Sequence, residues 1–140
     1  MKKIFFISFI IILAIASKVK AQPNIDTLAV LQTIVVNKSQ FVGQPFSKLL
    51  DSLKIQIKYF SPFGSLPYDM NKETSSSFSF YFPQSSNEMY LTYPKLRVSW
   101  YPFLNGALSE TLFGYFGGGW TPNVKTFYST GVVADIEIRD

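Results

Sequence analysis

The chain has 140 residues and a formal net charge of +4, with 13 basic and 9 acidic side chains and neither His nor Cys. Without these two residue types it has no Ser-His-Asp or Cys-His nucleophile arrangement, no common zinc site and no disulfide bridge. Aromatic residues make up 17% of the chain, with 14 Phe, 8 Tyr and 2 Trp, and this surplus leaves material for a binding face as well as a core.

The first 21 residues have the pattern of a cleaved secretory signal. Lys2 and Lys3 precede an apolar run over residues 4–16, and residues 19–21 form a small-residue cleavage site before Gln22. The run is shorter than the roughly 20 apolar residues that span a bilayer, so an uncleaved membrane anchor is the less favoured alternative. No Cys follows the run, which excludes the lipoprotein route. We therefore expect residues 1–21 to be removed and the rest to be exported to the periplasm or the cell exterior, since the Ala-Gln junction resembles those of bacterial envelope proteins.

Removal of the leader changes the charge of the protein. Four lysines and no acid lie in residues 1–21, so nine basic and nine acidic residues remain and the mature chain has no net charge. Because nucleic-acid binding needs a basic surface, the sequence predicts no nucleic-acid partner. It also predicts no membrane span after cleavage. Residues 22–140 have the length of a single small domain, and nothing in them indicates an oligomeric state.

The mature chain begins with two helical patterns. Residues 24–40 have apolar side chains at helical spacing with Asp26 as candidate N-cap, although the β-branched run Ile34–Val36 also favours a strand. Residues 43–53 combine a Pro at a first helical position with one apolar stripe, and so predict a second helix. The alternating residues 54–60 then predict a half-buried strand.

The rest of the chain favours strands. Residues 61–77 are rich in Ser, Pro, Gly and Asn and predict a long loop. Alternating apolar and polar side chains predict strands at 77–82, 95–101 and 131–139, with a further short strand at 88–94. In the last strand the alternation assigns four residues to the buried face: Val132, Ala134, Ile136 and Ile138. The sequence thus predicts an α+β domain in which one or two N-terminal helices pack on one face of an antiparallel sheet of about four to five strands.

The segment LFGYFGGGWTP, residues 112–122, holds four of the eight glycines. It lacks the Lys-Ser/Thr ending of a phosphate-binding P-loop and the spacing of a dinucleotide-binding loop. We expect its glycines to supply positive φ for a turn, such as a hairpin corner, or to allow a close approach of the backbone before the last strand. The aromatic residues in and before this segment either stack on a sugar or peptide ligand or cover the end of the sheet. The candidate ligand-binding residues are Tyr101, Phe103, Tyr115, Phe116 and Trp120.

Carboxylates are the remaining candidates for acid–base chemistry. Asp135 and Glu137 lie two apart on a predicted strand, which separates their Cα atoms by roughly 6.5–7 Å, near the carboxylate spacing of about 6.5–9.5 Å in inverting glycosidases. Glu110 lies close to the Gly-rich segment. The alternative is that all three are solvated charges. The residues after Gln22 contain no S-x-x-K and no G-x-S-x-G motif, so no catalytic residue is assigned.

Together these patterns favour a non-enzymatic binding or interaction module of the bacterial cell envelope or exterior. Its aromatic, Gly-rich loop would hold an envelope glycan or a protein partner through buried aromatic area. One alternative is a glycan-active hydrolase that uses Glu110 or the Asp135–Glu137 pair. Another is an inhibitor or immunity-type protein that turns the same surface against a protein. No cofactor and no metal site is predicted.

Overall fold

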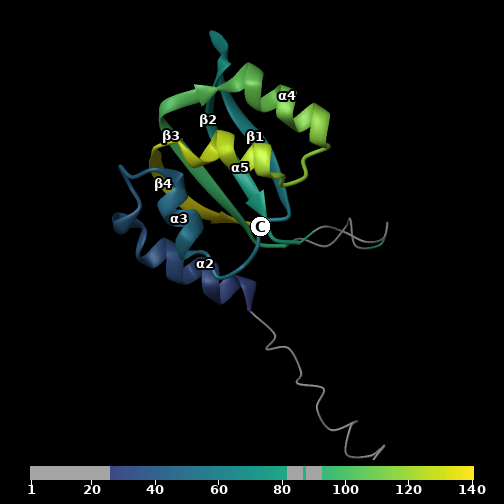
Figure 1. The fold of residues 1–140 in the computed structure, drawn as a ribbon. Helices are drawn as coiled ribbons and strands as arrows, with labels where there is room; N and C mark the ends of the chain where they lie inside the picture. The colour runs from purple at the N-terminus through teal and green to yellow at the C-terminus, as the bar shows by residue number, and fades with distance from the viewer. Residues whose placement is uncertain (1–25, 82–86, 88–92) are drawn as a thin grey trace, which may run out of the picture.

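The computed structural model describes residues 26–81, 87 and 93–140. The expected leader and most of the strand expected at 88–94 lie outside these residues. The described part of the chain contains four α-helices and an antiparallel sheet with the strand order β1-β2-β3-β4 (Figure 1). The elements are α2 (Thr27–Val36), a 3-10 turn (Lys38–Gln40), α3 (Phe46–Ser52), β1 (Tyr59–Leu66), β2 (Asp69–Ser79), β3 (Lys95–Asn105), α4 (Gly106–Phe116), α5 (Pro122–Ser129) and β4 (Val133–Arg139). The predicted α+β class is confirmed.

The two helices predicted near the N-terminus are both present. α2 is capped by Asp26, whose carboxylate accepts a hydrogen bond from the Ala29 backbone N–H at 3.2 Å. α3 begins directly after Pro45. Each helix buries an apolar stripe against the sheet, formed by Leu31 and Ile34 in α2 and by Phe46 and Leu49 in α3. The strand predicted after α3, at residues 54–60, begins only at Tyr59.

The prediction of a long loop at residues 61–77 is wrong, because this segment forms most of the β1–β2 hairpin. β1 is an outer strand, and an outer strand tolerates Pro62 because its free side needs no N–H donor. The serines of β2 are small enough to be buried where their hydroxyls have partners. Ser76 Oγ, for example, accepts a hydrogen bond from Trp100 Nε1 at 2.7 Å. Beyond this hairpin, the strand predicted at 77–82 ends at Ser79.

The Gly-rich segment joins two helices that the sequence did not predict. Residues 112–122 form the end of α4, a short link and the start of α5, and not a hairpin corner. Gly117 ends α4 with φ of 58°, the left-handed conformation that commonly closes a helix, and Gly118 follows with φ of 80°. Thr121 then caps α5, with Pro122 at its first position. Both helices lie beyond the N-terminal region in which helices were expected.

The link between α4 and α5 also pairs with the sheet. It lies on the outer side of β1, where the Phe60 N–H donates a hydrogen bond to Gly118 O at 2.8 Å. At the opposite edge of the sheet, the Val133 N–H of β4 donates to Gln44 O at 3.0 Å. Each outer strand is therefore hydrogen-bonded, over part of its length, to a short segment outside the sheet.

An extra residue in β4 changes which side chains are buried. β3 pairs two consecutive residues with Asp135 and Val133, which leaves Ala134 as a bulge. The bulge reverses the alternation along the strand, so Val133 is buried in the core while Val132 is only partly buried. The predicted alternation is therefore wrong at the start of β4 and right at Ile136, which is buried.

A larger irregularity widens β3 on its other side. Pairing between β3 and β2 runs up to Ser99 and resumes at Leu104, so residues 100–103 lie opposite the single residue Thr74. This stretch accommodates Pro102, which a regular central strand would exclude, and the peptide bond before Pro102 is cis. Two of the predicted ligand-binding residues, Tyr101 and Phe103, lie in this widened stretch.

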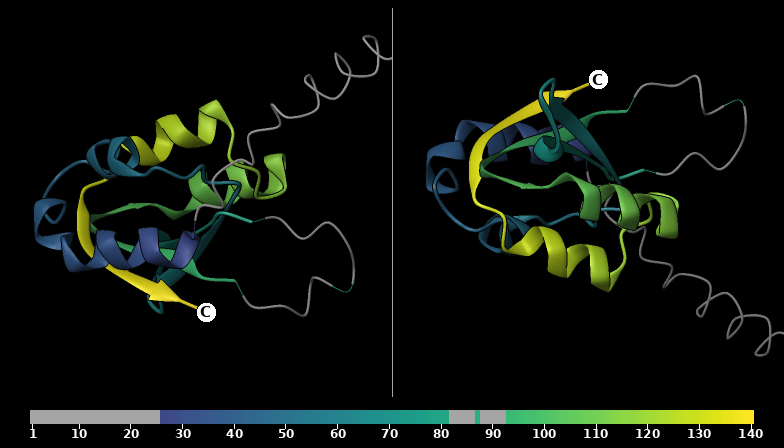
Figure 2. Two further views of the ribbon diagram at one scale, coloured as in Figure 1. Left: turned by 90° about the horizontal axis from the view of Figure 1, so that it is seen from below. Right: turned by 90° about the horizontal axis from the view of Figure 1, so that it is seen from above.

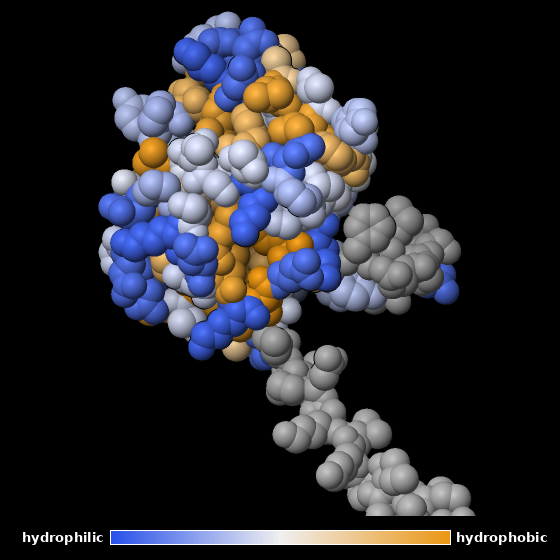
Figure 3. Space-filling model, in the orientation of Figure 1, coloured by the Kyte–Doolittle hydropathy of each residue, from blue (hydrophilic) through white to orange (hydrophobic). Residues whose placement is uncertain are grey.

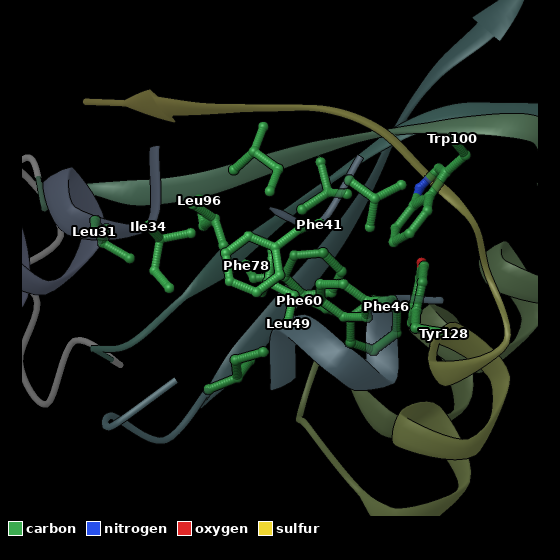
Figure 4. Packing of buried hydrophobic residues seen from close by; sticks show 14 of the residues in the cluster. Leu31, Ile34, Phe41, Phe46, Leu49, Phe60, Phe78, Leu96, Trp100 and Tyr128 are labelled. Carbon is green, nitrogen blue, oxygen red and sulfur yellow. The ribbon is translucent and has the colours of Figure 1, made fainter. Parts of the chain in front are cut away.

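One cluster of buried side chains joins the helices to the sheet. Trp100 of β3 and Tyr128 of α5 stack at one end of the cluster with ring centroids 5.8 Å apart, and Leu31 and Ile34 of α2 lie at the other end (Figure 4). Views from below and above show α3 and α5 on one side of the strands (Figure 2). On this side, apolar surface is visible over α4 and between hydrophilic residues in the middle of the molecule (Figure 3). The opposite side of β3 and β4 carries polar side chains.

Candidate functional site

The five predicted ligand-binding residues occupy three different settings. Tyr101 and Phe103 project from the widened stretch of β3, with 71% and 40% of their surface exposed and ring centroids 6.2 Å apart. Tyr115 and Phe116 lie at the end of α4, and Tyr115 is 81% exposed. Trp120 lies in the link before α5. The structure thus brings these residues together as two adjacent pairs and a separate Trp.

Trp120 is part of the core packing. It is partly buried, its indole stacks on Tyr128 with ring centroids 6.1 Å apart, and it meets the Phe78 ring edge-on at 5.5 Å. For this residue the structure favours the alternative in which an aromatic side chain of the Gly-rich segment covers the sheet.

Tyr101 and Phe103 border a shallow hollow on the face of the sheet that is opposite the core. The hollow has a volume of about 730 Å³ and is lined by residues of β2, β3 and β4. Its principal side chains are Ser75, Arg97, Tyr101, Phe103, Glu137 and Arg139. We refer to it as the sheet-face hollow.

The charged side chains of the sheet-face hollow are paired with one another. Arg97 Nη1 lies 3.7 Å from Glu137 Oε1, and Arg139 Nη2 lies 2.9 Å from the same oxygen. Arg97 also donates hydrogen bonds to Ser75 Oγ at 3.1 and 3.2 Å. The carboxylate of Glu137 thus lies between the guanidinium groups of Arg97 and Arg139, and these contacts hold the three side chains in place.

The acid pair suggested by the sequence, Asp135 and Glu137, lies in the same hollow. Asp135 accepts a hydrogen bond from Lys38 Nζ at 2.6 Å, and this bond holds the pKa of Asp135 below its usual range. A carboxyl group with a lowered pKa is a poor proton donor near neutral pH. Glu137 accepts a hydrogen bond from Arg139 Nε at 2.9 Å. These contacts favour the alternative in which both acids are surface charges.

A second polar cluster lies inside the fold, and it centres on Glu73, which is only 3% exposed. Its carboxylate accepts hydrogen bonds from Tyr128 Oη at 3.1 Å and from Ser76 Oγ. Ser76 in turn accepts from Trp100, so two core aromatic residues are tied to one buried acid. Glu73 was not predicted as a site residue, because residues 61–77 were expected to form a loop. The alternation of Phe78 and Ser76 extends the strand pattern into this segment, but it would place Thr74 and not Glu73 on the core face, because the register with β3 shifts between Glu73 and Ser75.

The environment of Glu73 shifts its acidity. Burial raises the pKa of the Glu73 carboxyl, hydrogen bonds from Ser109, Ser76 and Tyr128 lower it part of the way back, and the charge of Glu110 raises it further. Burial, followed by the charge of Glu73, also raises the pKa of Tyr128. A buried carboxyl with a raised pKa can act as a proton donor at a higher pH than an ordinary glutamate.

Glu73 also lines a pocket of about 220 Å³ between β1, β2 and α4. Ser109 and Glu110 of α4 lie on one wall of this pocket. Gly106 allows α4 to begin close to β2, since a Cβ atom there would lie 3.0 Å from the Asn71 carbonyl carbon. We call this the Glu73 pocket. It has no lining residue in common with the sheet-face hollow.

No protein-family model, curated protein or solved structure matches this chain. Within the residues that the structure describes, no three His, Cys, Asp or Glu side chains gather closely enough to hold a metal ion. Over the same described ranges, no helix combines the length and the apolar character needed to cross a bilayer. The sheet-face hollow and the Glu73 pocket are therefore the two candidate functional sites.

Proposed function

We propose that the chain is a non-enzymatic binding module of the bacterial cell envelope or exterior, and that Tyr101 and Phe103 with the sheet-face hollow form its contact surface. The observation that carries this proposal is a pair of neighbouring aromatic rings exposed by 71% and 40% at the border of a concave polar surface. By contrast, Phe60, Phe78 and Trp100 of the same strands are buried in the core. Exposed aromatic area beside a concavity supports recognition, because a partner recovers the free energy of burying it.

The location is proposed from the N-terminal sequence. The basic start, the apolar run and the small-residue junction of residues 1–21 support export. The balance of nine basic and nine acidic residues after position 21 supports a partner held by shape, apolar area and hydrogen bonds. An envelope glycan or an envelope protein meets these conditions.

Binding of the purified protein to cell-envelope fragments of the source organism tests the proposal. We expect Tyr101→Ala and Phe103→Ala each to weaken binding about tenfold, the equivalent of about 1.4 kcal/mol. Both side chains are exposed, so the melting temperature should stay within a few degrees of the wild type.

Matched control variants come from exposed tyrosines elsewhere on the surface. Tyr68→Ala removes a side chain that is 85% exposed at the tip of the β1–β2 hairpin, and Tyr115→Ala removes the exposed ring at the end of α4. Both should bind like the wild type. Loss of binding in Tyr115→Ala with full binding in Tyr101→Ala would move the contact surface to α4 and contradict the proposal.

A second candidate function, hydrolysis of an envelope glycan, is favoured by the Glu73 pocket. Glu73 is buried, its pKa is raised, and Glu110 lines the same pocket. In this candidate Glu73 gives its proton to the glycosidic oxygen as the bond to the anomeric carbon breaks, and Glu110 takes a proton from the water that attacks that carbon. The products are a new reducing end and an alcohol.

An assay for the release of reducing ends from the envelope glycan tests this second candidate function. Hydrolysis should be lost in Glu73→Gln and in Glu110→Gln, and retained in Asp135→Asn, which changes an acid outside the pocket. Equal turnover in Glu73→Gln and the wild type, or no turnover in any form, rejects the hydrolase and leaves Glu73 as a structural group.

A further inference from the structure

We infer that the ligand of the sheet-face hollow is an uncharged saccharide, an inference that rests on the binding function proposed above. Three features of the hollow carry it: the arrangement of its two aromatic rings, the internal pairing of its charges and the position of β3 inside the sheet.

The aromatic rings suit the faces of sugar rings. Tyr101 and Phe103 stand nearly perpendicular to each other, with an interplanar angle of 89° and ring centroids 6.2 Å apart. Tyr101 is the more exposed of the two, so a ligand can lie against its ring. A pyranose ring presents a patch of C–H groups on one face, and this patch packs on the negative face of an aromatic ring.

The charges of the hollow favour a ligand without charge. Glu137 already lies between Arg97 and Arg139, at 3.7 and 2.9 Å. An anionic ligand would compete with Glu137 for the two guanidinium groups, and a cationic ligand would compete with those groups for Glu137. A hydroxyl group, by contrast, donates one hydrogen bond and accepts others, so it can bridge Glu137 and an arginine without separating them.

The position of β3 disfavours an extended peptide as the ligand. Peptides that bind sheets add a strand at a free edge, where unpaired main-chain groups hold them. The hollow lies on the face of the sheet, and the main chain of β3 is paired with β2 from Lys95 to Ser99 and with β4 from Lys95 to Trp100, so only the short widened stretch at residues 100–103 lies outside the β2 ladder. Side chains such as Arg97, Ser99 and Glu137 therefore provide the hydrogen-bonding groups there, and they suit a polyhydroxyl ligand.

The test uses one envelope preparation treated in two ways. One portion is digested with a broad protease, and the other is treated with trifluoromethanesulfonic acid, which breaks glycosidic bonds and leaves peptide bonds intact. We expect the purified protein to bind the protease-treated fragments as it binds untreated ones, and to lose binding to the acid-treated fragments. Tyr101→Ala should bind the protease-treated fragments about tenfold more weakly than the wild type does.

Ionic strength adds a second measurement on the same material. Binding of an uncharged ligand should change less than twofold between 50 and 500 mM NaCl, since only interactions between charges are strongly screened. A tenfold loss of affinity over this range would identify a charged ligand and overturn the inference.

The outcomes separate this inference from the proposed function. Binding that is lost after protease digestion, or that survives acid treatment, assigns the ligand to protein and overturns the saccharide while the binding module stands. Untreated fragments that fail to bind, or that bind Tyr101→Ala and the wild type equally, overturn the proposed function itself.

Discussion

The buried carboxyl group of Glu73 links the stability of the protein to pH. Burial raises its folded-state pKa above the ordinary glutamate value of 4.5, so the folded protein favours the protonated form more than the unfolded chain does. The stabilisation that follows is complete below the unfolded-state pKa and is lost as the pH rises through the higher folded-state pKa. The contribution of Glu73 therefore weakens as the pH rises above about 4.5.

Substitution of Glu73 by Gln should remove this pH dependence. The amide has nearly the same shape as the carboxyl group and does not ionise, while all other titrating groups stay in place. We expect the free energy of unfolding of the wild type, relative to Glu73→Gln, to fall as the pH rises from about 4.5 to neutral pH. Urea denaturation of both proteins at a series of pH values measures this difference. Parallel stability curves would show that Glu73 has the same pKa in the folded and unfolded states.

Trp120 should be important for stability. Its indole lies against Tyr128 and Phe78, so Trp120→Ala leaves a space beside the core. We expect a loss of about 3 kcal/mol, near the lower end for truncation of a large aromatic residue, because Trp120 is only partly buried.

Tyr115→Ala is the matched control for Trp120→Ala, since it removes an exposed ring from the same region. It should change the free energy of unfolding by no more than about 0.5 kcal/mol in the same urea titration. Equal effects of the two substitutions would mean that the Trp120 indole faces the solvent.

The link between α4 and α5 depends on glycine for two different reasons. Gly117 and Gly118 both have positive φ, at 58° and 80°. A Cβ atom on Gly117 would meet open space, whereas one on Gly118 would lie 2.0 Å from the Tyr59 ring. Gly117 is thus needed for its backbone conformation alone, and Gly118 is needed for both its conformation and the room it leaves.

This difference predicts unequal effects of alanine in the link. Gly117→Ala should cost about 1 kcal/mol, the strain of placing a Cβ atom in the left-handed conformation. Gly118→Ala should cost at least twice as much, because the Tyr59 ring must also move and the hydrogen bond from the Phe60 N–H to Gly118 O is disturbed. Thermal unfolding of the two variants, followed by circular dichroism, gives the comparison. A Gly118→Ala variant as stable as Gly117→Ala would contradict the close approach of the link to β1.

A single cluster of buried side chains connects all four described strands with α2, α3 and α5. Such a core predicts one cooperative unfolding transition. The two Trp residues are well placed to test it, since Trp100 is buried in the cluster and Trp120 packs against it. Tryptophan fluorescence and far-ultraviolet circular dichroism should give the same transition midpoint in urea. Separate midpoints would indicate parts that unfold independently.

The sequence predicted the elements whose signals are local. A cap at Asp26 and short apolar stripes were enough for α2 and α3, and simple alternation was enough for the first part of β3. The β1–β2 hairpin was missed because its buried serines depend on partners that are distant in the sequence, such as Trp100. The bulge at Ala134 was missed because only pairing with β3 defines it.

The candidate site was predicted only in part, because several of its features also depend on residues that are distant in the sequence. Tyr101 and Phe103 are recognisable as aromatic residues in a polar context, and the structure places both beside the sheet-face hollow. Glu73 was missed because its burial and hydrogen bonds come from β2, α4 and α5 together. The segment around Trp120 has the composition of an exposed aromatic platform. Only the packing of α5 shows that the Trp120 side chain contacts the core.

The two short segments that pair with the outer strands have a consequence for behaviour at high concentration. A free strand edge offers unpaired main-chain groups that another chain can extend into an intermolecular sheet, the first step of fibril growth. Here the α4–α5 link occupies part of the outer side of β1, and Gln44 with its neighbours occupies the start of β4. Pro62, further along β1, lacks the N–H that a growing sheet would need. The Gly-rich segment thereby helps to protect this aromatic-rich chain against aggregation.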